Sequence, residues 1–391
     1  MPVNVKRPKI VQDILGRVEA LGDDPYQFLR DWKARNDRKI IACLPMHFPL
    51  EMIHATGMLP VEMWPSNERI TIAHSYVHVF YCGLSRSIVD DALQGKLEFL
   101  DGMYFYDQCM QARGLPFVIE RNTPIPNIEF HHLPPIISNP DVVKPHLKWN
   151  LEKIRKSLER ISGKALSDDA ISQSIKIYNK NRKLLQRLYR TRKKNPGLLR
   201  AREIARIVQA SALMLKEEHN ELLEQLLPEL EKLPVVPDNR VKIFIVGHFC
   251  HPPRFDVMDM IEDEGMVVVD DDIYNGARYF ALSVNEDVNP IDGLADKFLD
   301  RSLPCPTRID NEVNWGQYVK DKFHACGAQG VINLLAKYCP PHQERYVDIK
   351  RELARNNIPE LLIELEHEAV SLEGLKTRLQ ALREQIEMGV K

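Results

Sequence analysis

Apolar runs of strand length alternate with helical patterns over about residues 38–150 of the chain. The strand-like runs are RKIIACLPM, MLPVEMW and GMYFY, and the helical patterns are PLEMIHATG and SRSIVDDALQG. A Pro-rich strand-and-loop stretch is predicted next, in LPFVIERNTPIPNIEFHHLPPIIS. Alternation of this kind is typical of βαβ units around a parallel sheet. Pro49 at a helix start, Gly57 at its end and Ser85 as the cap of the following helix agree with it.

The same alternation returns from Val241 onward. Strand-like runs are VKIFIVGHF, MVVVDDDI, GVINLLAKYC and IPELLIELE, and the predicted helices are FDVMDMIEDEG, ERYVDIKRELARNN and a charged terminal helix from about Leu372. We therefore predict an α/β protein with two doubly wound parallel-sheet lobes of the Rossmann or flavodoxin type.

The residues between the two lobes change to a helical pattern. Ser167, followed by Asp168 and Asp169, is a good helix start, and apolar residues then recur at helical spacing. A second long helix is expected over about 199–227. The predicted organisation is an N-terminal α/β lobe at 1–150, a helical segment at 151–237 and a C-terminal α/β lobe at 238–391.

A basic run lies inside this helical segment. Between Arg182 and Arg206 the chain carries ten Lys or Arg and only one acid, Glu203. Two interpretations stay open. The run forms a solvated helix face, or it docks an acidic partner or the phosphates of a nucleotide-bearing substrate.

Composition narrows the class of protein. The chain has 391 residues, of which 44% are hydrophobic and 28% charged, as in globular proteins, and its formal net charge of −2 gives no reason to expect nucleic acid binding. We find no signal-peptide pattern and no apolar stretch of membrane-spanning length. We therefore expect a cytoplasmic protein without a membrane contact. In that reducing compartment its seven cysteines are thiols or metal ligands.

Several familiar motifs are missing from the sequence. There is no G-x-x-x-x-G-K-[ST] phosphate loop, no G-x-G-x-x-G, no G-x-S-x-G and no H-E-x-x-H. We therefore expect no ATP site in this chain, and any energy input must come from elsewhere.

Two cysteines close strand-like runs in opposite halves of the chain. Cys109 ends FLDGMYFYDQC, Cys339 ends GVINLLAKYC, and Cys82 lies upstream in YCGLSRS. Open α/β sheets place their chemistry at the carboxyl ends of strands, so these thiols could converge on one crevice and hold a metal or an iron–sulfur cluster. Cysteine is also a small, easily buried hydrophobe, and each one alone is compatible with a core position.

The order of motifs carries a family resemblance. CLPMHFPLEMIHATGMLPVEMW, YCGLSRSIVDDAL, LDGMYFYDQC, GHFCHPPRFDVMDMIEDEGMVVVDDDIYNGARYF and GVINLLAKYCPPH resemble the benzoyl-CoA reductase and 2-hydroxyacyl-CoA dehydratase family over about residues 38–367. The segment GKALSDDAISQSIKIYNKNRKLLQRLY and the stretch FCHPP are more similar to the ATP-dependent benzoyl-CoA reductase branch.

The resemblance implies a cofactor and its ligands. Members of this family pair two related subunits, each typically holding a [4Fe–4S] cluster through three cysteines. The matching positions are Cys82, Cys109 and Cys339, and Cys250, in the loop after a strand of the second lobe, is the substitute candidate. The remaining three cysteines, Cys43, Cys305 and Cys326, are expected to be structural.

The resemblance also implies an activity and partners. The expected protein is an iron–sulfur subunit of a hetero-oligomeric oxidoreductase of anaerobic aromatic degradation. It would reduce the ring of an aromatic acyl-CoA, benzoyl-CoA, to a cyclic diene thioester. Electrons would come from ferredoxin through a separate ATP-hydrolysing iron–sulfur activator. A 2-hydroxyacyl-CoA dehydratase subunit, which eliminates water through a radical, and a non-catalytic partner or cluster-assembly subunit remain alternatives.

The proton donor is not identified by the sequence. Histidine has a suitable pKa range for this task, and the candidates near the predicted crevice are His47, His54, His248, His251 and His342. Each is equally compatible with a packing or loop role. The triplet Asp270, Asp271 and Asp272 follows a predicted strand, and we expect it to cap the next helix rather than to act in catalysis.

Overall fold

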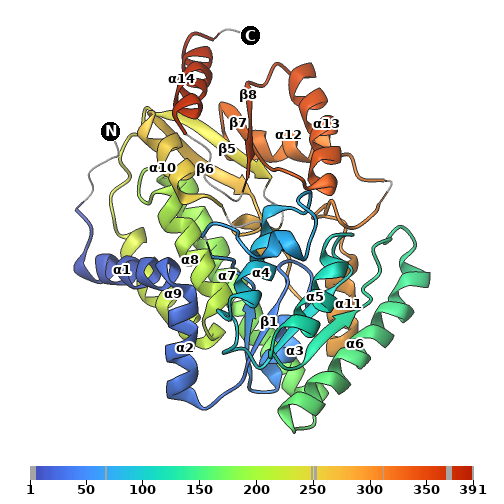
Figure 1. Ribbon diagram of the computed structural model, residues 1–391. Coiled ribbons are helices and arrows are strands. Elements are labelled where there is room, and N and C mark those ends of the chain that lie inside the picture. Colours follow the sequence, from blue (N-terminus) through green and yellow to red (C-terminus); the bar gives the residue numbers. More distant parts are fainter. Residues whose placement is uncertain are drawn as a thin grey trace.

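The computed structural model describes residues 6–66, 68–247, 250, 253–310, 312–366 and 372–389. In these ranges the strands form two four-stranded parallel sheets, with orders β2-β1-β3-β4 and β6-β5-β7-β8, and helices pack against both. Figure 1 shows the two sheets as separate lobes, the second above the first. The predicted α/β class with two doubly wound lobes is confirmed.

The first lobe is built on short, buried strands. Its strands are β1 (Ile40–Cys43), β2 (Leu59–Glu62), β3 (Gly102–Tyr106) and β4 (Ile128–His131). Its connecting helices are α3 (Leu50–Ala55), α4 (Gly83–Leu93) and α5 (Leu115–Asn122). The central strands β1 and β3 are buried along their whole length, as expected where helices cover both faces of a parallel sheet.

The second lobe repeats this plan. Its strands are β5 (Val241–Gly247), β6 (Met266–Asp272), β7 (Gly330–Ala336) and β8 (Glu360–Leu365). Its helices are α10 (Phe255–Asp263), α12 (Trp315–Cys326), α13 (Pro340–Arg355) and α14 (Glu373–Glu387). All four sequence-predicted strands of this lobe are present.

Further helices surround and connect the lobes. They are α1 (Lys9–Asp23), α2 (Pro25–Asn36), α6 (Pro140–Ser162), α7 (Asp168–Lys194), α8 (Ala201–Leu213), α9 (Lys216–Glu231) and α11 (Pro290–Leu299). Short 3-10 turns are η1 (Ala73–Ser75), η2 (Ala112–Gly114) and η3 (Ala277–Phe280). Ser167 caps α7 as predicted, since its side chain accepts from the Ala170 N–H. None of the helices in the described part of the chain combines the length and apolar character needed to cross a membrane.

Three local predictions are wrong. The stretch LPFVIERN is helix α5, because Pro116 fits its first turn and the apolar residues face one side. Ser85 lies inside α4, which begins at Gly83 after Cys82. The single helix over 199–227 is two helices, because Met214 adopts an extended backbone and ends α8 before α9 begins.

The basic run is largely an internal ion-pair system. Arg182 pairs with Glu51, Arg192 with Asp271 and Arg206 with Asp23, and all three guanidinium side chains are buried. Further pairs of the run are Arg187–Glu231, Lys193–Asp270, Arg200–Asp263 and Arg202–Glu19. A purely solvated face is therefore excluded for the buried members, and most of this charge is already neutralised by acids of the same chain.

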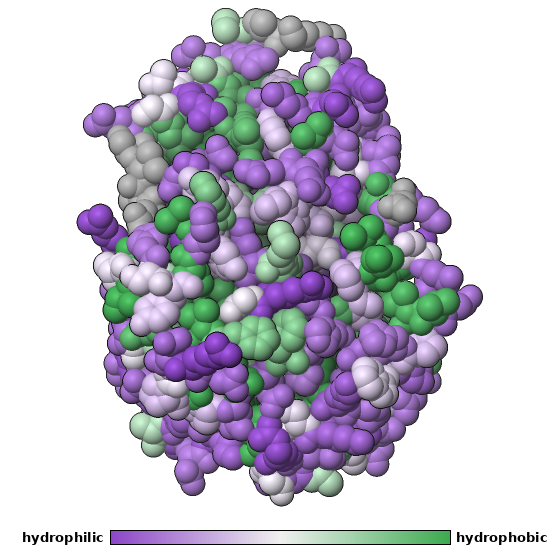
Figure 2. All heavy atoms as spheres, turned by 45° about the vertical axis from the view of Figure 1, so that its right-hand side comes forward, coloured by the Kyte–Doolittle hydropathy of each residue, from purple (hydrophilic) through white to green (hydrophobic). Residues whose placement is uncertain are grey.

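The segment after β6 returns to the first lobe. Phe280, Leu294 and Phe298 belong to the same hydrophobic core as β1 and β3, while β5 and β7 lie in separate cores. A parallel bridge between Ile136 and Ile309 adds a backbone link. The apolar side chains are thus mostly interior, and the face in Figure 2 is polar over most of its area with separate apolar groups.

Gly247 at the end of β5 provides a test of this packing. Its φ is +114°, and a Cβ atom there would lie 2.1 Å from the Leu334 carbonyl oxygen and 2.9 Å from His342 Nε2. We predict that Gly247→Ala lowers the free energy of unfolding by at least about 2 kcal/mol, through strain and displacement of β7. Urea denaturation measures this, with Gly16→Ala in α1, where nothing lies within 4 Å, as the control. An unchanged denaturation midpoint for Gly247→Ala would contradict the close packing.

Candidate functional site

Three of the four cysteines of interest lie at the carboxyl ends of central strands. Cys109 follows β3, Cys250 follows β5, and Cys339 follows β7 as the N-cap of α13. Cys82 is the N-cap of α4. In each sheet the chain order reverses beside these strands, which is where open α/β sheets form ligand crevices.

One cavity of about 450 Å³ collects these thiols from both lobes. Cys82 and Cys109 line it from the first lobe, and Cys250 and Cys339 line it from the second. We call it the cysteine cavity. Much of its remaining wall is apolar and includes Leu44, Leu84, Met110, Pro135, Pro306, Ile309, Pro340 and Pro341. The carboxyl ends of the two sheets therefore face one another across this space.

The four thiols influence one another electrostatically. Burial raises the pKa of Cys109 to about 12, and the neighbouring Cys82 and Cys339 add to this. The pKa of Cys250 is raised well above its usual value, first by a hydrogen bond with Cys339 and then by burial. The Cys109 and Cys250 thiols therefore stay protonated at neutral pH by themselves, whereas a bound cation would favour thiolate forms.

Gln111 links the cysteine-bearing segments. Its side-chain oxygen accepts from the Cys82 N–H at 2.8 Å, and its amide nitrogen donates to the Tyr338 carbonyl at 3.0 Å. Tyr338 directly precedes Cys339. One side chain thus connects both lobes at the cysteine cavity. Sequence reasoning missed Gln111, although its position two residues after Cys109 was a local signal.

The donor set suits an iron–sulfur cluster better than a single ion. Among the described residues, no three His, Cys, Asp or Glu side chains are grouped closely enough to hold one metal ion. A cluster offers separate irons to separate thiolates, so its ligands need not meet at one point. Four cysteines around an apolar cavity are consistent with that requirement.

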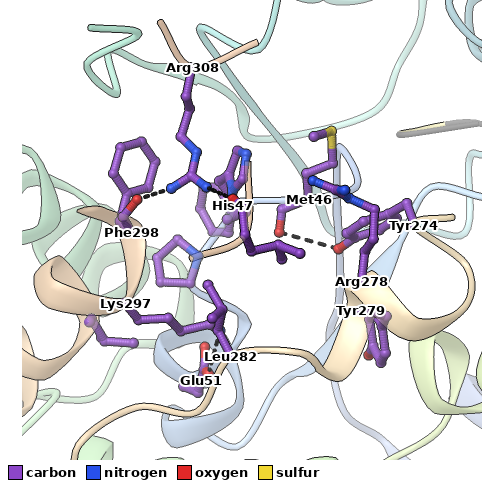
Figure 3. A pocket seen from close by; sticks show the side chains of 14 residues that line it. Met46, His47, Glu51, Tyr274, Arg278, Tyr279, Leu282, Lys297, Phe298 and Arg308 are labelled. Atoms are coloured by element: carbon purple, nitrogen blue, oxygen red, sulfur yellow. Dashed lines mark hydrogen bonds and ion pairs between the residues drawn. The ribbon is translucent and has the colours of Figure 1, made fainter. Parts of the chain in front are cut away.

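Two smaller cavities lie beside the cysteine cavity. Their volumes are about 80 Å³ and 30 Å³. They share six residues, Met46, Phe48, Glu51, Tyr274, Tyr279 and Lys297. We call them together the charged chamber, and Figure 3 shows the side chains that line the larger of the two. It lies between the loop after β1 with α3 on one side and the segments after β6 with α11 on the other.

The two spaces are neighbours through hydrogen-bonded side chains. His47 lines the charged chamber, and its Nε2 lies 3.0 Å from Cys305 Sγ. Cys305 Sγ in turn lies 3.1 Å from Thr307 Oγ1, and Thr307 lines the cysteine cavity. A ligand in the charged chamber would therefore be separated from the thiols by little more than these side chains and the loop after β1.

Glu51 is the buried carboxylate of the charged chamber. Burial by itself would raise its pKa, but Lys297 and Arg182 outweigh burial and lower the pKa to about 2. Lys297 Nζ lies 3.4 Å from Glu51 Oε1, and Arg182 donates to the same oxygen. Burial, assisted by Arg182, lowers the pKa of Lys297 to about 8. Arg278 and Arg308 also line the chamber, so its walls carry more cations than acids.

The five candidate histidines are dispersed. His47 lines the charged chamber, and its pKa lies well below the usual value because of burial and the nearby Arg308 and Arg278. His54 hydrogen-bonds Ser174 and Glu217 and lines neither space. His342 is buried beside Gly247. His248 and His251 lie outside the described residues.

The remaining chemistry-bearing residues are structural in their contacts. The acidic triplet lies in β6, where Asp270 pairs with Lys193, Asp271 with Arg192 and Asp272 with Arg278. Asp271 additionally accepts from the Ala277 N–H at the start of η3. The other three cysteines are Cys43, buried in β1, Cys305, beside His47, and Cys326, bonded to the Phe323 carbonyl.

Comparison with known proteins adds a family match. The family model described as 2-hydroxyglutaryl-CoA dehydratase, D-component, matches residues 45–386. A benzoyl-CoA reductase subunit of Thauera aromatica is 29% identical over 89% of this chain and 91% of that protein. The (R)-phenyllactyl-CoA dehydratase beta subunit of Clostridium sporogenes is 27% identical over 93% and 96%. The (R)-2-hydroxyglutaryl-CoA dehydratase beta subunit of Acidaminococcus fermentans is 26% identical over 96% and 100%.

The buried ion pair beside the charged chamber can be tested by mutation. Arg182→Met leaves Glu51 with Lys297 as its only cationic contact in the described chain, so we predict a loss of about 3 kcal/mol of stability. The matched control is Arg187→Met on the same helix, which removes a half-exposed pair with Glu231 and should cost less than about 1 kcal/mol. Chemical denaturation of both variants gives the comparison. Equally small losses of stability in the two variants would show that the buried pair stabilises the protein no more than the exposed pair does.

Proposed function

Because the chain belongs to the 2-hydroxyglutaryl-CoA dehydratase D-component family, we propose that it is the iron–sulfur subunit of an enzyme acting on an acyl-CoA thioester. The observation that carries this proposal is the convergence of four cysteines from two lobes on one cavity. The relatives named above are reductase or dehydratase subunits, which supports a role in a hetero-oligomeric enzyme.

We assign the cluster to Cys82, Cys109 and Cys339, with Cys250 as the substitute ligand. Each lines the cysteine cavity, and the first three come from two loops of one lobe and one loop of the other. A bound [4Fe–4S] cluster supplies single electrons at low potential. The chain's part is to orient the thiolates through Gln111 and to keep water away with the apolar wall.

The leading activity is reduction of the aromatic ring of benzoyl-CoA to a cyclic diene thioester. It is supported by the branch resemblance and by the similarity to the benzoyl-CoA reductase relative from Thauera aromatica. An electron added to an aromatic thioester needs a donor below the range of ordinary nicotinamide cofactors. The sequence has no phosphate loop, so we assign ATP hydrolysis to a separate activator supplied by ferredoxin.

Dehydration of a 2-hydroxyacyl-CoA is the second candidate. Relatives named as dehydratase beta subunits have nearly the same identity and coverage as the reductase relative. The two activities differ in electron balance, because the reductase consumes electrons in each turnover and the dehydratase returns them. A non-catalytic partner or cluster-assembly subunit is the third candidate.

The charged chamber is the place we assign to the acyl group. Phe48, Tyr274, Tyr279 and Phe298 provide aromatic walls, and the cationic excess suits a thioester carbonyl that gains negative charge. Of the two lysines that line the chamber, Lys297 hydrogen-bonds Glu51 and so holds that carboxylate in place. These side chains would bind and orient the acyl group next to the cysteine cavity.

Removal of single cysteines tests the cluster assignment. We predict that Cys82→Ala, Cys109→Ala and Cys339→Ala each lose most of the iron and acid-labile sulfide of the anaerobically purified complex, because a cluster site lacks a thiolate. The control is Cys326→Ala, because the Cys326 thiol hydrogen-bonds the Phe323 carbonyl and does not line the cavity. Full iron in one variant would remove that cysteine from the ligand set, and full iron in Cys339→Ala alone would favour Cys250.

Substrate turnover tests the activity. The loaded wild-type complex, with activator, ATP and reductant, is expected to convert benzoyl-CoA to a diene thioester detectable by mass spectrometry. Clusters without benzoyl-CoA turnover but with water elimination from a 2-hydroxyacyl-CoA would establish the dehydratase. Protein that stays free of iron after anaerobic reconstitution would contradict both enzymatic functions.

A further inference from the structure

Glu62 is a buried carboxyl group that the proposed function has not used. It is the last residue of β2, 3% exposed, and it lines the smaller part of the charged chamber. Its Oε1 hydrogen-bonds Tyr274 Oη, whereas its Oε2 has no hydrogen-bond partner among the described residues. A buried carboxylate oxygen without a partner is costly, so this oxygen calls for either a proton or a ligand.

Hydrogen counting around Tyr274 concerns the other oxygen, Oε1, and it favours a protonated carboxyl group. Tyr274 Oη lies close to two acceptors, Glu62 Oε1 and the Met46 carbonyl oxygen at 3.2 Å, but a phenol has only one hydrogen to donate. If Glu62 is protonated, it donates to Tyr274, which donates to Met46, and both bonds form. If Glu62 is ionised, one of the two acceptors is left without a donor.

The lysines that face Glu62 are occupied elsewhere. Lys216 Nζ donates to the Ser211 carbonyl, to Ser211 Oγ at 3.0 Å and to Tyr279 Oη at 2.6 Å, which uses all three of its hydrogens. Lys297 bonds Glu51. Within the described part of the chain neither lysine hydrogen-bonds Glu62, so both favour its carboxylate form by electrostatic attraction alone. The other titratable groups around Glu62 are Cys43 on the paired strand β1, Glu51, Tyr106, Arg182 and Tyr279.

The effects of burial and of these neighbours nearly balance, which leaves the pKa of Glu62 near neutral pH. Burial raises the pKa of Glu62 to about 7, against the opposing effects of Tyr274, Lys216, Lys297 and the Met46 backbone. Glu51 is ionised at neutral pH, and His47 is neutral. Lys216 also has a pKa near 7 but directs its hydrogens to Ser211 and Tyr279. Among the described carboxyl groups lining the chamber, Glu62 is therefore the one that can hold and release a proton near pH 7.

We propose that Glu62 is the acid that protonates the acyl group in the charged chamber, with Tyr274 as its positioning residue. This inference rests on the proposed function. The Glu62 O–H bond breaks and a C–H or O–H bond forms on the anionic acyl group, whose electrons come from the low-potential one-electron donor. The resulting carboxylate is stabilised by the Tyr274 hydrogen bond and faces Lys216 and Lys297.

The geometry places Glu62 next to the larger part of the chamber. The part of the chamber that Glu62 lines, about 30 Å³, is wide enough for a water molecule and adjoins the larger part, with which it shares six lining residues. Met46 has a φ of +96°, a strained conformation for a residue with a side chain. This backbone turn places the Met46 carbonyl at Tyr274, so the strain supports the same hydrogen-bond chain.

Variants of the assembled, cluster-loaded complex test the proposal. For Glu62→Gln we expect at least about a hundredfold lower kcat with unchanged iron content and KM, because the proton donor is lost while its shape remains. In the wild type, activity should fall as pH rises through about 7. In Tyr274→Phe we expect a lower kcat at unchanged iron content, because Glu62 loses the hydrogen bond that positions it. Glu129→Gln on β4, a carboxylate paired with Arg160 outside both spaces, is the control.

Infrared difference spectroscopy between pH 6 and pH 8 gives a readout that needs no turnover. A carboxylic C=O band that is present in the wild type and Glu129→Gln but absent in Glu62→Gln would support the proposal. An unchanged band in Glu62→Gln, or wild-type kcat and pH dependence in that variant, would overturn it. Loaded wild-type complex that converts neither benzoyl-CoA nor a 2-hydroxyacyl-CoA would overturn the proposed function and the catalytic role of Glu62, while the band would still report whether Glu62 holds a proton.

Discussion

Two buried ion pairs on a single helix hold the two lobes against each other. Arg182 of α7 pairs with Glu51 in the first lobe, and Arg192 of the same helix pairs with Asp271 in the second. At 1.5 Å per residue these arginines are about 15 Å apart along the helix axis. The cysteine cavity is lined by both lobes and Arg182 itself lines the charged chamber, so both spaces depend on this spacing. A rigid helix with a fixed charge at each contact is well suited to that task.

Parallel strand order then decides where the chemistry can lie. Residues after β3, β5 and β7 all emerge at carboxyl ends, so thiols that are far apart in the sequence meet once the sheets face each other. This is why Cys109 and Cys339 could be singled out from strand endings alone. The same rule applies to Cys250, which entered only as a substitute and yet lines the same cavity. Strand endings carry this information because register and direction are fixed by the buried sheet.

Other parts of the site could not be derived in this way. Glu62, Lys216 and Tyr274 come from distant elements, and each by itself is an ordinary residue of a strand end, a helix start or a loop. Their importance lies in burial and in the number of hydrogens available to them, which only the tertiary structure defines. The return of the segment after β6 to the first core was equally invisible, because its apolar residues fit either lobe. The break between α8 and α9 lacks a Pro or Gly that would mark it.

The contrast between the two spaces has a physical logic for the proposed reaction. The cysteine cavity is largely apolar, which limits the solvent reorganisation that accompanies electron transfer, whereas the charged chamber holds acids and bases with displaced pKa values. A proton donor placed among the thiols would protonate the thiolates that a bound cluster would need as ligands. Separation by the loop after β1 and the Cys305–Thr307 contact keeps the two functions apart while leaving them adjacent. An acyl group in the charged chamber would gain its electron from the side of the cysteine cavity and its proton from Glu62.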